Sequence, residues 1–321
     1  MYKYVKHKDI NYYLWDECIE QSPNGIIYAL SWYLNIVSPD WDAIIKEEKG
    51  KYKIVLPVTK QKKYLINILK KPILTYGLGL IGNNIEKTDC SDVMKIITKR
   101  FLIVNEYLLN EHQSEFNLPQ EFNLNLIQNF TIDLTLGYEK IYKNYSLNRK
   151  RDIKMASRQG IKVRNSDDLE GFIQEYTKNT GNKITGFLGE QFENKIIRNV
   201  YQSSVLRGYS KLLEVVNEES KIVCSGIFLI YKGRISYLLG QSNTEGRQSG
   251  AMSYLIDYLI RTNDHLKIFD FSGSYLSNLA IYFQRFGATK TEFGSISKNE
   301  LPIIVKTAMR VRRFLIARTK F

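Results

Sequence analysis

Three side chains in the second half of the chain have the chemistry to exchange a proton with a substrate. Asp270 ends an apolar run and precedes Ser272 and Gly273, Glu214 lies in a run with strand character, and Tyr282 lies in a helical pattern. A carboxylate can accept a proton from an attacking nucleophile, and a tyrosine hydroxyl can donate one to a leaving group. These three are therefore candidate catalytic residues. Asp270 has a competing structural interpretation, because such a residue often caps the next helix or fixes a loop.

A glycine-rich stretch joins a predicted strand, 234–240, to a predicted helix that begins near residue 248. Backbone N–H groups at a helix N-terminus carry partial positive charge, and glycine lets a ligand approach the backbone closely. The stretch is a candidate site for the phosphate groups of a cofactor, although a plain turn before a core helix would use the same residues. The candidate binding residues are Leu239, Gly240, Gln241, Arg247, Gln248, Ser249, Gly250 and Ala251.

A strongly basic helical segment, 142–165, contains Asp152 as its one acid. Such a face suits the phosphates of CoA, the backbone of tRNA or a pyrophosphate-linked lipid. A solvated helix face is the alternative interpretation. The candidate phosphate-binding residues in it are Arg149, Arg151 and Lys154.

Metal and hydrolase chemistry lack their usual residue patterns. The cysteines lie far apart without a CxxC pair, the histidines are isolated without HExxH, and no Ser or Cys stands in a GxSxG context. We therefore predict no metal site and no disulfide framework. Cys224 lies in an apolar run and is predicted to be a small core residue. The residues concerned are Cys18, Cys90 and Cys224, and His7, His112 and His265.

The net charge of the chain is +13 and its pI is about 9.4. A basic surface suits polyanionic partners. The same charge would follow from general enrichment in Lys, Asn, Ile and Tyr, so charge alone does not identify a partner.

Hydrophobic periodicity indicates a mixed α and β chain. From residue 168 the predicted order is two helices, a three-strand meander, a helix, a strand, a helix and a final strand. The meander strands are 209–216, 221–231 and 234–241, and Lys232-Gly233 between the last two is a strong hairpin signal. Single long helices are predicted at 91–111, 138–159 and 248–263.

Several motifs together resemble the FemAB-type branch of the GNAT acyltransferase superfamily. Residues 247–252 resemble the loop that holds the CoA pyrophosphate in GNAT proteins, with Met252 where a small residue is usual. Asp270, followed by small residues and then by 283–288 (Phe-Gln-Arg-Phe-Gly-Ala), resembles a FemAB signature in which Gln284 stands where Lys is usual. Phe283 holds the place where many GNAT enzymes have a tyrosine. Weaker matches in the first half extend the resemblance over nearly the whole chain.

This resemblance implies an α/β (α+β) fold of two tandem GNAT-like domains, with mixed, mostly antiparallel sheets flanked by helices. We expect a degenerate domain at 1–137, an acyltransferase domain at 138–300 and a basic C-terminal helix at 301–321. The resemblance also implies an N-acyltransferase. Such an enzyme would transfer an acetyl or aminoacyl group from acyl-CoA or aminoacyl-tRNA to an amine, such as a cell-envelope precursor. Lys183 and Phe187 match the loop that lines the acceptor pocket.

Two other functions remain open from the sequence. One is a nucleic-acid-binding module that uses the basic face, with tRNA as the partner. The other is an inactive relative that acts through interactions, which the departures at Phe283, Gln284 and Met252 favour.

The N-terminus has no apolar signal-peptide core, and no apolar stretch reaches the roughly 20 residues of a spanning helix, so we expect a cytoplasmic protein. The basic tail is expected either to pack on the first domain or to lie on an anionic membrane.

Overall fold

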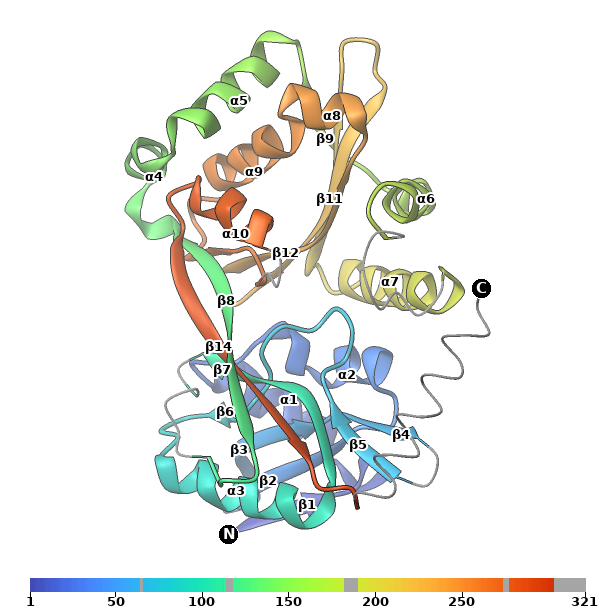
Figure 1. Cartoon of the computed structure of the whole chain (residues 1–321), viewed down its shortest axis with the longest axis vertical. Coiled ribbons are helices and arrows are strands. Elements are labelled where there is room, and N and C mark those ends of the chain that lie inside the picture. Colours follow the sequence, from blue (N-terminus) through green and yellow to red (C-terminus); the bar gives the residue numbers. More distant parts are fainter. Residues whose placement is uncertain (64–65, 112, 114–117, 182–189, 274–276, 303–321) are drawn as a thin grey trace. The chain divides into compact units, whose positions relative to one another are not determined.

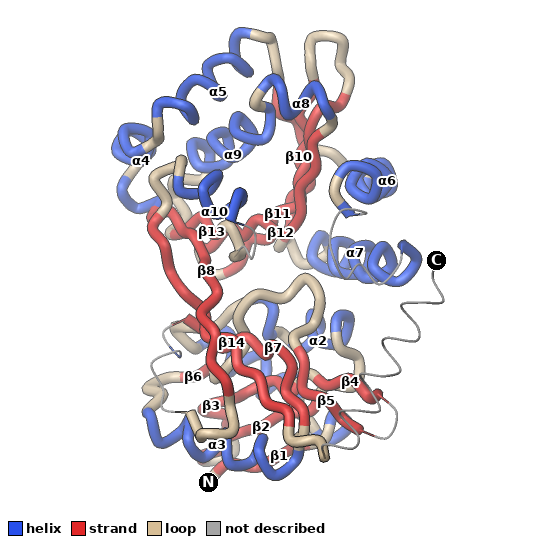
Figure 2. Tube along the Cα trace, in the orientation of Figure 1, coloured by secondary structure: helices blue, strands red, loops and turns tan. Residues whose placement is uncertain are grey.

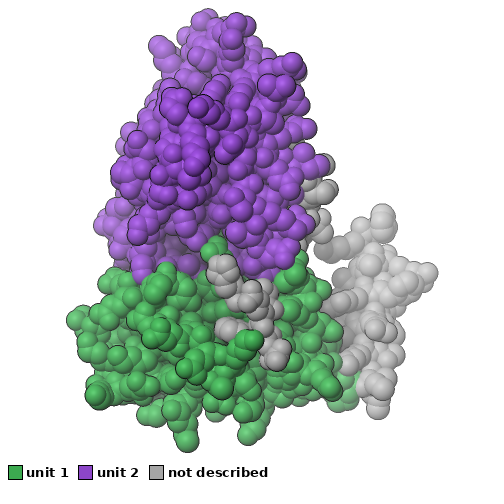
Figure 3. Space-filling view, turned by 90° about the vertical axis from the view of Figure 1, so that its left-hand side faces the viewer, with its two compact units in different colours: residues 1–24, 40–126, 294–321 green, residues 25–39, 127–293 purple. Residues whose placement is uncertain are grey.

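The computed structural model describes residues 1–63, 66–111, 113, 118–181, 190–273 and 277–302 (Figure 1). The chain forms two compact units (coloured separately in Figure 3). Unit 1 contains Met1–Asn24, Asp40–Leu126 and Gly294–Phe321, and unit 2 contains Gly25–Pro39 and Ile127–Phe293. Segments of the two units alternate along the chain, so the units differ from the continuous ranges expected from the sequence. The expected C-terminal helix falls, from residue 303 on, outside the described residues.

Unit 1 is built around a four-stranded sheet with the strand order β1-β2-β3-β6. Its strands pair antiparallel, and β5 pairs with β7 in parallel. Strands β8 (Asn123–Asp133) and β14 (Thr289–Asn299) have residues in both units. The other main elements of unit 1 are β1 (Tyr2–Val5), α1 (Tyr12–Gln21), β2 (Asp42–Glu48), β3 (Lys51–Val58), β4 (Lys60–Lys63), β5 (Ile66–Lys70), β6 (Ile81–Gly82), α3 (Lys87–Arg100) and β7 (Ile103–Glu111).

Unit 2 contains the strand order β8-β13-β12-β11-β10-β9, in which β12 and β13 are parallel and the other neighbours antiparallel (Figure 2). Helices α5 and α9 cover one face of the β10–β12 strands, and α6 and α7 lie on the other (Figure 1). The elements are α2 (Ser31–Val37), α4 (Tyr138–Asn144), α5 (Leu147–Arg158), β9 (Lys162–Asn165), α6 (Leu169–Asn179), α7 (Glu190–Val205), β10 (Ser210–Val216), β11 (Ile222–Tyr231), β12 (Arg234–Ser242), α8 (Thr244–Ser249), α9 (Ala251–Thr262), β13 (Ile268–Asp270) and α10 (Ser277–Gln284).

The predicted meander is confirmed. Strands β10, β11 and β12 pair in sequence, and Lys232 and Gly233 both have positive φ, +49° and +76°. Two positive φ values in succession are typical of the tight turn whose twist matches antiparallel strands. Gly160, the residue directly after the helix predicted at 138–159, follows α5 with φ +61°. These turn residues therefore have the positive φ values that a tight turn and a helix end require.

The core of unit 2 is rich in phenylalanine. Phe130, Phe228, Phe269, Phe271 and Phe286 are all buried. The rings of Phe271 and Phe283 stack with centroids 4.4 Å apart. Burying a Phe side chain is worth roughly 1.5–3 kcal/mol, so this cluster fixes helix α10 against β13.

Three predicted long helices are wrong in extent. The helix expected at 91–111 ends at Arg100, and its second part is strand β7. Residues 107–110 are all buried, which suits a strand covered on both faces. The helix expected at 138–159 breaks at Tyr145–Ser146, where the Ser146 side chain caps α5 by accepting from the Arg149 N–H. The helix expected at 248–263 begins earlier, as α8, and breaks at Gly250.

Candidate active site

The parallel strands β12 and β13 separate after a short ladder. They pair only at Arg234–Ile268, Ile235–Phe269 and Ser236–Asp270, while β12 runs on to Ser242. A register shift follows, because Tyr237 and Leu239 oppose adjacent residues of β11 and Leu238 has no opposing residue there. Bulges are enriched beside active sites, and ligands bind where parallel strands of an α/β sheet separate at their carboxyl ends. We call this region, from Tyr237 to Gln241 and from Asp270 to Gly273, the strand opening.

The segment after β12 forms two helices rather than one loop and a helix. Asn243 caps α8 by accepting from the Gly246 N–H at 2.8 Å. Gly250 has φ +74° and begins α9 without a side-chain cap. A Cβ at Gly250 would lie 2.9 Å from the carbonyl oxygen of Asp152 on α5. The glycine is thus required by its conformation and by the close approach of another helix.

The predicted phosphate-binding residues divide into exposed and buried groups. Arg247 is exposed and donates to the carbonyl of Ser242 and the hydroxyl of Thr244. Gln248 is exposed as well, whereas Ser249 and Ala251 are buried. An uncapped helix N-terminus with one adjacent exposed arginine can accept an anion.

Residues 239–241 on β12 lie close to α9 and α6. A Cβ at Gly240 would overlap the Tyr237 hydroxyl and meet the methyl carbon of Met252 at 2.8 Å. Gln241 is buried, donates to Ser225 at 2.8 Å and accepts from Asn179 of α6 at 3.1 Å. Leu239 is also buried. The side chains of Leu239 and Gln241 are therefore structural, and a ligand in the opening would meet the β12 backbone.

Asp270 fixes the loop that follows β13. One carboxylate oxygen accepts from the Arg234 guanidinium at 2.6 Å. The other accepts from the Asn129 amide at 3.0 Å and from the Ser272 N–H at 2.8 Å. Both oxygens are engaged and the residue is buried, so the structural interpretation of Asp270 fits better than that of a proton acceptor.

Glu214 is held in a similar way two strands from β12. Its oxygens accept from Arg164 at 2.8 Å and from the Ser166 hydroxyl at 2.6 Å. Glu214 is buried on β10, opposite Ser225 of β11 and in the same row as Gln241. It stabilises the β9–β10 edge and has different partners from Asp270.

Tyr282 belongs to α10 and contacts α9. Its hydroxyl is 3.2 Å from that of Ser253, and its ring lies 4.0 Å from the Arg149 guanidinium. Burial raises the pKa of Tyr282 to about 12, against a lowering by Arg149. A tyrosine of this kind stays protonated near neutral pH and can donate a hydrogen bond. The three candidate catalytic side chains thus have three separate sets of partners.

Arg149 does not belong to the exposed basic face. Its side chain is 1% exposed, and its guanidinium lies 4.0 Å from the Tyr282 ring and 4.3 Å from the Phe286 ring. It donates to the Ser253 hydroxyl, to Asp152 at 3.0 Å and to the Tyr282 carbonyl at 3.2 Å. Burial lowers the pKa of this guanidinium. Arg149 joins α5, α9 and α10.

Arg151 and Lys154 are exposed on α5, and their contact with a polyanion stays a prediction. Lys183 and Phe187, the candidate acceptor-pocket residues, lie outside the described residues. Cys224 is fully buried, and burial raises the pKa of its thiol to about 12, which confirms its core role. In the described ranges, no three His, Cys, Asp or Glu side chains are grouped to hold a metal ion.

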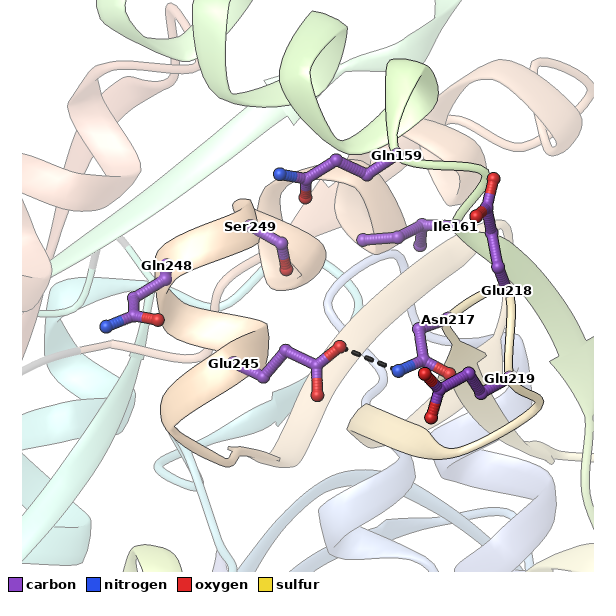
Figure 4. Close-up of a pocket in the computed structure, with 8 residues that line it drawn as sticks. All are labelled: Gln159, Ile161, Asn217, Glu218, Glu219, Glu245, Gln248 and Ser249. Atoms are coloured by element: carbon purple, nitrogen blue, oxygen red, sulfur yellow. Dashed lines mark hydrogen bonds between the residues drawn. The ribbon is translucent and has the colours of Figure 1, made fainter.

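A cavity with a volume of about 330 Å³ lies beside α8 (Figure 4). Glu218, Glu219 and Glu245 line it, and Glu245 accepts from Asn217 at 2.7 Å. The other lining residues are Gln159, Ile161, Asn217, Gln248 and Ser249. None of the lining side chains is basic, so this cavity does not suit a phosphate.

Sequence reasoning missed Arg234 and Asn129, which hold Asp270, and Ser253, which holds Arg149. Asn129 is 141 positions from Asp270, so no local pattern could link them. Arg234 and Asp270 are 36 positions apart, at the ends of two strands, and their opposite charges were a readable signal.

The fold matches several solved structures over most of the chain. FemX superposes with a TM-score of 0.65 over 89% of this chain and 96% of its own, at 12% identity. At this identity the likeness concerns the fold alone, and it agrees with the FemAB-like fold that the sequence motifs predict. A tandem GNAT protein from the clavulanic acid biosynthesis pathway superposes with a TM-score of 0.55 over 94% and 99%, at 8% identity. The C-terminal domain of a putative lysylphosphatidylglycerol synthetase from Agrobacterium fabrum gives 0.56 over 93% and 94%, at 10% identity.

The expected two-domain GNAT-like fold class is confirmed by these likenesses. No protein-family model matches the sequence, and no curated protein sequence does. Within the described residues, no helix has the length and apolar composition to cross a membrane.

Proposed function

We propose that this protein is an N-acyltransferase that works at the strand opening of unit 2. The observation that carries the proposal is the separation of β12 from β13 after three residue pairs, with the register shift at Leu238 directly beyond. An open strand edge offers backbone N–H and C=O groups to an extended ligand. An acyl carrier that contains amide groups can pair with such an edge.

In this reaction the amine nitrogen attacks the acyl carbonyl. A new C–N bond forms, the C–S or C–O bond to the carrier breaks, and the nitrogen loses a proton. Backbone N–H groups of β12 near Leu238 would polarise the carbonyl, an effect that mutagenesis at similar sites puts at about 2.7–4 kcal/mol. Holding the two reactants together supplies much of the remaining rate enhancement.

The described side chains act mainly as positioning residues in this proposal. Asp270 holds the 270–273 loop, and Gln241 holds β12 against α6. Because both oxygens of Asp270 are engaged, the proton leaves the amine to a bound water rather than to this carboxylate. Tyr282 is 3.2 Å from Ser253 near the start of α9, where its hydroxyl can donate to the departing carrier.

The donor is either acyl-CoA or an aminoacyl-tRNA, and the acceptor is an amine, for which a cell-envelope precursor in the cytoplasm is our working choice. The uncapped start of α9 and exposed Arg247 support an anionic carrier. The carboxylates of Glu218, Glu219 and Glu245 beside α8 would repel an anionic carrier that extended into the cavity that they line.

The test is thermal unfolding with CoA, with acetyl-CoA and with a charged tRNA, followed by transfer of a labelled acyl group to a panel of amines. A ligand at 100 times its dissociation constant adds about 2.7 kcal/mol to the free energy of unfolding. We expect one carrier to stabilise the protein and to donate its acyl group. Arg247→Ala should weaken the stabilisation, whereas Arg261→Ala, an exposed arginine at the other end of α9, should not.

Stabilisation by neither carrier, with no transfer to any amine, would refute the proposal. Stabilisation without transfer would favour the inactive, binding-only alternative.

A further inference from the structure

The loop that follows β13 has an uncommon backbone conformation at Ser272. Ser272 has φ +60°, a value that few residues other than glycine adopt. The residue is 1% exposed and belongs to unit 2. Residues in sparsely populated conformations persist only where their surroundings impose them, and such residues cluster at functional sites. The contacts that hold this loop are therefore candidates for a functional role.

The peptide group after Ser272 has a defined orientation. The Gly273 N–H donates to the side-chain oxygen of Asn129 on β8 at 2.6 Å. A trans peptide group holds its C=O and N–H on opposite sides, so the Ser272 carbonyl points away from β8. Strands β8 and β12 flank β13 on opposite sides. The Ser272 carbonyl therefore faces the side of β12, beyond the last β12–β13 pair, Ser236–Asp270, and so toward the strand opening.

A second contact to the loop comes from the first part of the chain. Tyr28 lies in the segment Gly25–Pro39, which belongs to unit 2 and is fixed there by α2, packed against α7. The Tyr28 hydroxyl is 3.4 Å from the Ser272 hydroxyl, and both side chains are buried. This distance is at the outer limit for a hydrogen bond, so the contact made by Asn129 is the stronger one. Tyr28 thus holds the side chain of Ser272, and Asn129 holds the peptide group that follows it.

The orientation of the Ser272 carbonyl suits the nitrogen of an attacking amine. When an amine attacks an acyl carbonyl, its nitrogen gains positive charge before it loses a proton. The negative end of a peptide dipole that points into the opening stabilises this charge, and a group fixed in advance does not reorganise during the reaction. The opposite wall, β12, offers N–H groups near Leu238 to the acyl oxygen. The two walls of the opening thus have opposite polarity, which matches the two reactants.

We propose that Asn129 and Tyr28 are positioning residues that keep the Ser272 carbonyl directed toward the attacking amine, an inference that rests on the proposed function. Both side chains are buried, so they act through the loop rather than on the reactants. Gly273 and, on the β12 side, Gly240 are partly exposed, which gives the amine access to the opening. Both positioning residues precede residue 138, so the acyltransferase domain expected at 138–300 would lack them.

The kinetic test compares Asn129→Ala and Tyr28→Phe with two matched controls. Asn263→Ala removes a buried amide at the end of α9, and Tyr107→Phe removes a buried, hydrogen-bonded hydroxyl in unit 1. With the carrier and amine identified in the transfer assay, Asn129→Ala should lower kcat by about 100-fold, the size found for loss of one oriented group. Tyr28→Phe should lower kcat less. The KM for the carrier should not change, because the carrier pairs with β12, and the controls should keep the wild-type kcat.

A spectroscopic test reports on the loop without acyl transfer. The pair Phe-Ser occurs once in the sequence, at 271–272. The full chain, labelled with ¹³C at phenylalanine carbonyls and with ¹⁵N at serine, therefore gives a single HNCO signal, from the peptide group directly before Ser272. Asn129→Ala and Tyr28→Phe should shift this signal. Asn263→Ala and Tyr107→Phe should leave it in place.

The two measurements distinguish failure of this inference from failure of the proposed function. An unshifted signal in both loop variants, with acyl transfer by the wild type, would overturn the inference and leave the proposed function standing. A shifted signal with an unchanged kcat would overturn it too, as would equal losses of kcat in the loop variants and the controls. A shifted signal without any transfer by the wild type would refute the proposed function, while it would support the two residues as those that hold the loop.

Discussion

Helix α5 places two arginines on opposite faces with opposite environments. Arg149 is enclosed by two aromatic rings and donates hydrogen bonds to α9 and α10, whereas Arg151 is exposed to solvent. The residue type and the local sequence are nearly the same. A basic run in the sequence can therefore contain both structural residues and candidates for ligand binding. The face of the helix on which a residue lies distinguishes the two.

Among the variants that test this comparison, replacement of Arg149 should change the free energy of unfolding most. Arg149→Ala leaves a cavity between Tyr282 and Phe286 and an unpaired Tyr282 carbonyl, so we expect the free energy of unfolding to fall by about 3 kcal/mol. Urea denaturation would measure it. Arg149→Met, which fills most of the volume without the charge, is the control. A Met variant as unstable as the Ala variant would assign the effect to charge and hydrogen bonds rather than to packing.

The contact between α5 and α9 offers a second test of the buried face. Gly250→Ala forces a residue with a Cβ into φ +74° and places that Cβ 2.9 Å from the Asp152 carbonyl oxygen. We expect a loss of roughly 2 kcal/mol, from strain of about 1–3 kcal/mol at such positions. Thermal unfolding would measure the loss, with Gly208→Ala, φ +71° and no close neighbour, as the control for conformation alone. Equal losses in the two variants would mean that α5 does not constrain Gly250.

A buried carboxyl on α9, which contacts Tyr138 of the neighbouring helix α4, makes stability sensitive to pH. Burial raises the pKa of Asp257 above its ordinary 3.8, against the lowering by the Tyr138 hydroxyl, which donates to it at 3.0 Å. The folded state therefore holds a proton that the unfolded state has lost, and stability falls as pH rises from about 4 through the folded pKa.

Asp257→Asn should remove this fall, because the amide does not ionise and still accepts from Tyr138. Relative to the wild type, the variant should gain stability between pH 4 and pH 7, by about 1.4 kcal/mol per unit of pKa shift. Urea denaturation at both pH values measures the difference. A difference that is the same at both values would show that Asp257 titrates alike in the folded and unfolded states.

The smallest effect is expected on the exposed face. Arg151→Ala should change the free energy of unfolding by no more than about 0.5 kcal/mol, because the side chain is exposed. The same urea experiment that measures Arg149→Ala measures it. A loss near that of Arg149→Ala would remove the contrast between the two faces.

Much of the fold could be predicted from local patterns. The meander of unit 2 lies where periodicity and turn residues placed it. The β7 segment was mistaken for a helix because Val104 and Leu108 continued the helical spacing of α3. Spacing over a few residues cannot separate a fully buried strand from a helix.

The candidate site was predictable only where its residues are close in sequence. The glycine-rich stretch after β12 was found, but the break at Gly250 and the approach of α5 were not. Asp270 was noticed, and its structural role depends on Asn129 and Arg234, which come from other strands.

By itself, the sequence determined the mixed fold, the order of its elements in unit 2 and the positions of its glycine turns, because these depend on local propensity and spacing. Only the tertiary structure decided which charged groups are engaged. The partners of Arg149 on α9 and α10 lie 104 and 133 positions away in the chain. A side chain's burial and its hydrogen bonds are set by such distant neighbours, so one arginine of α5 became structural while the next, two residues on, is free to meet a ligand.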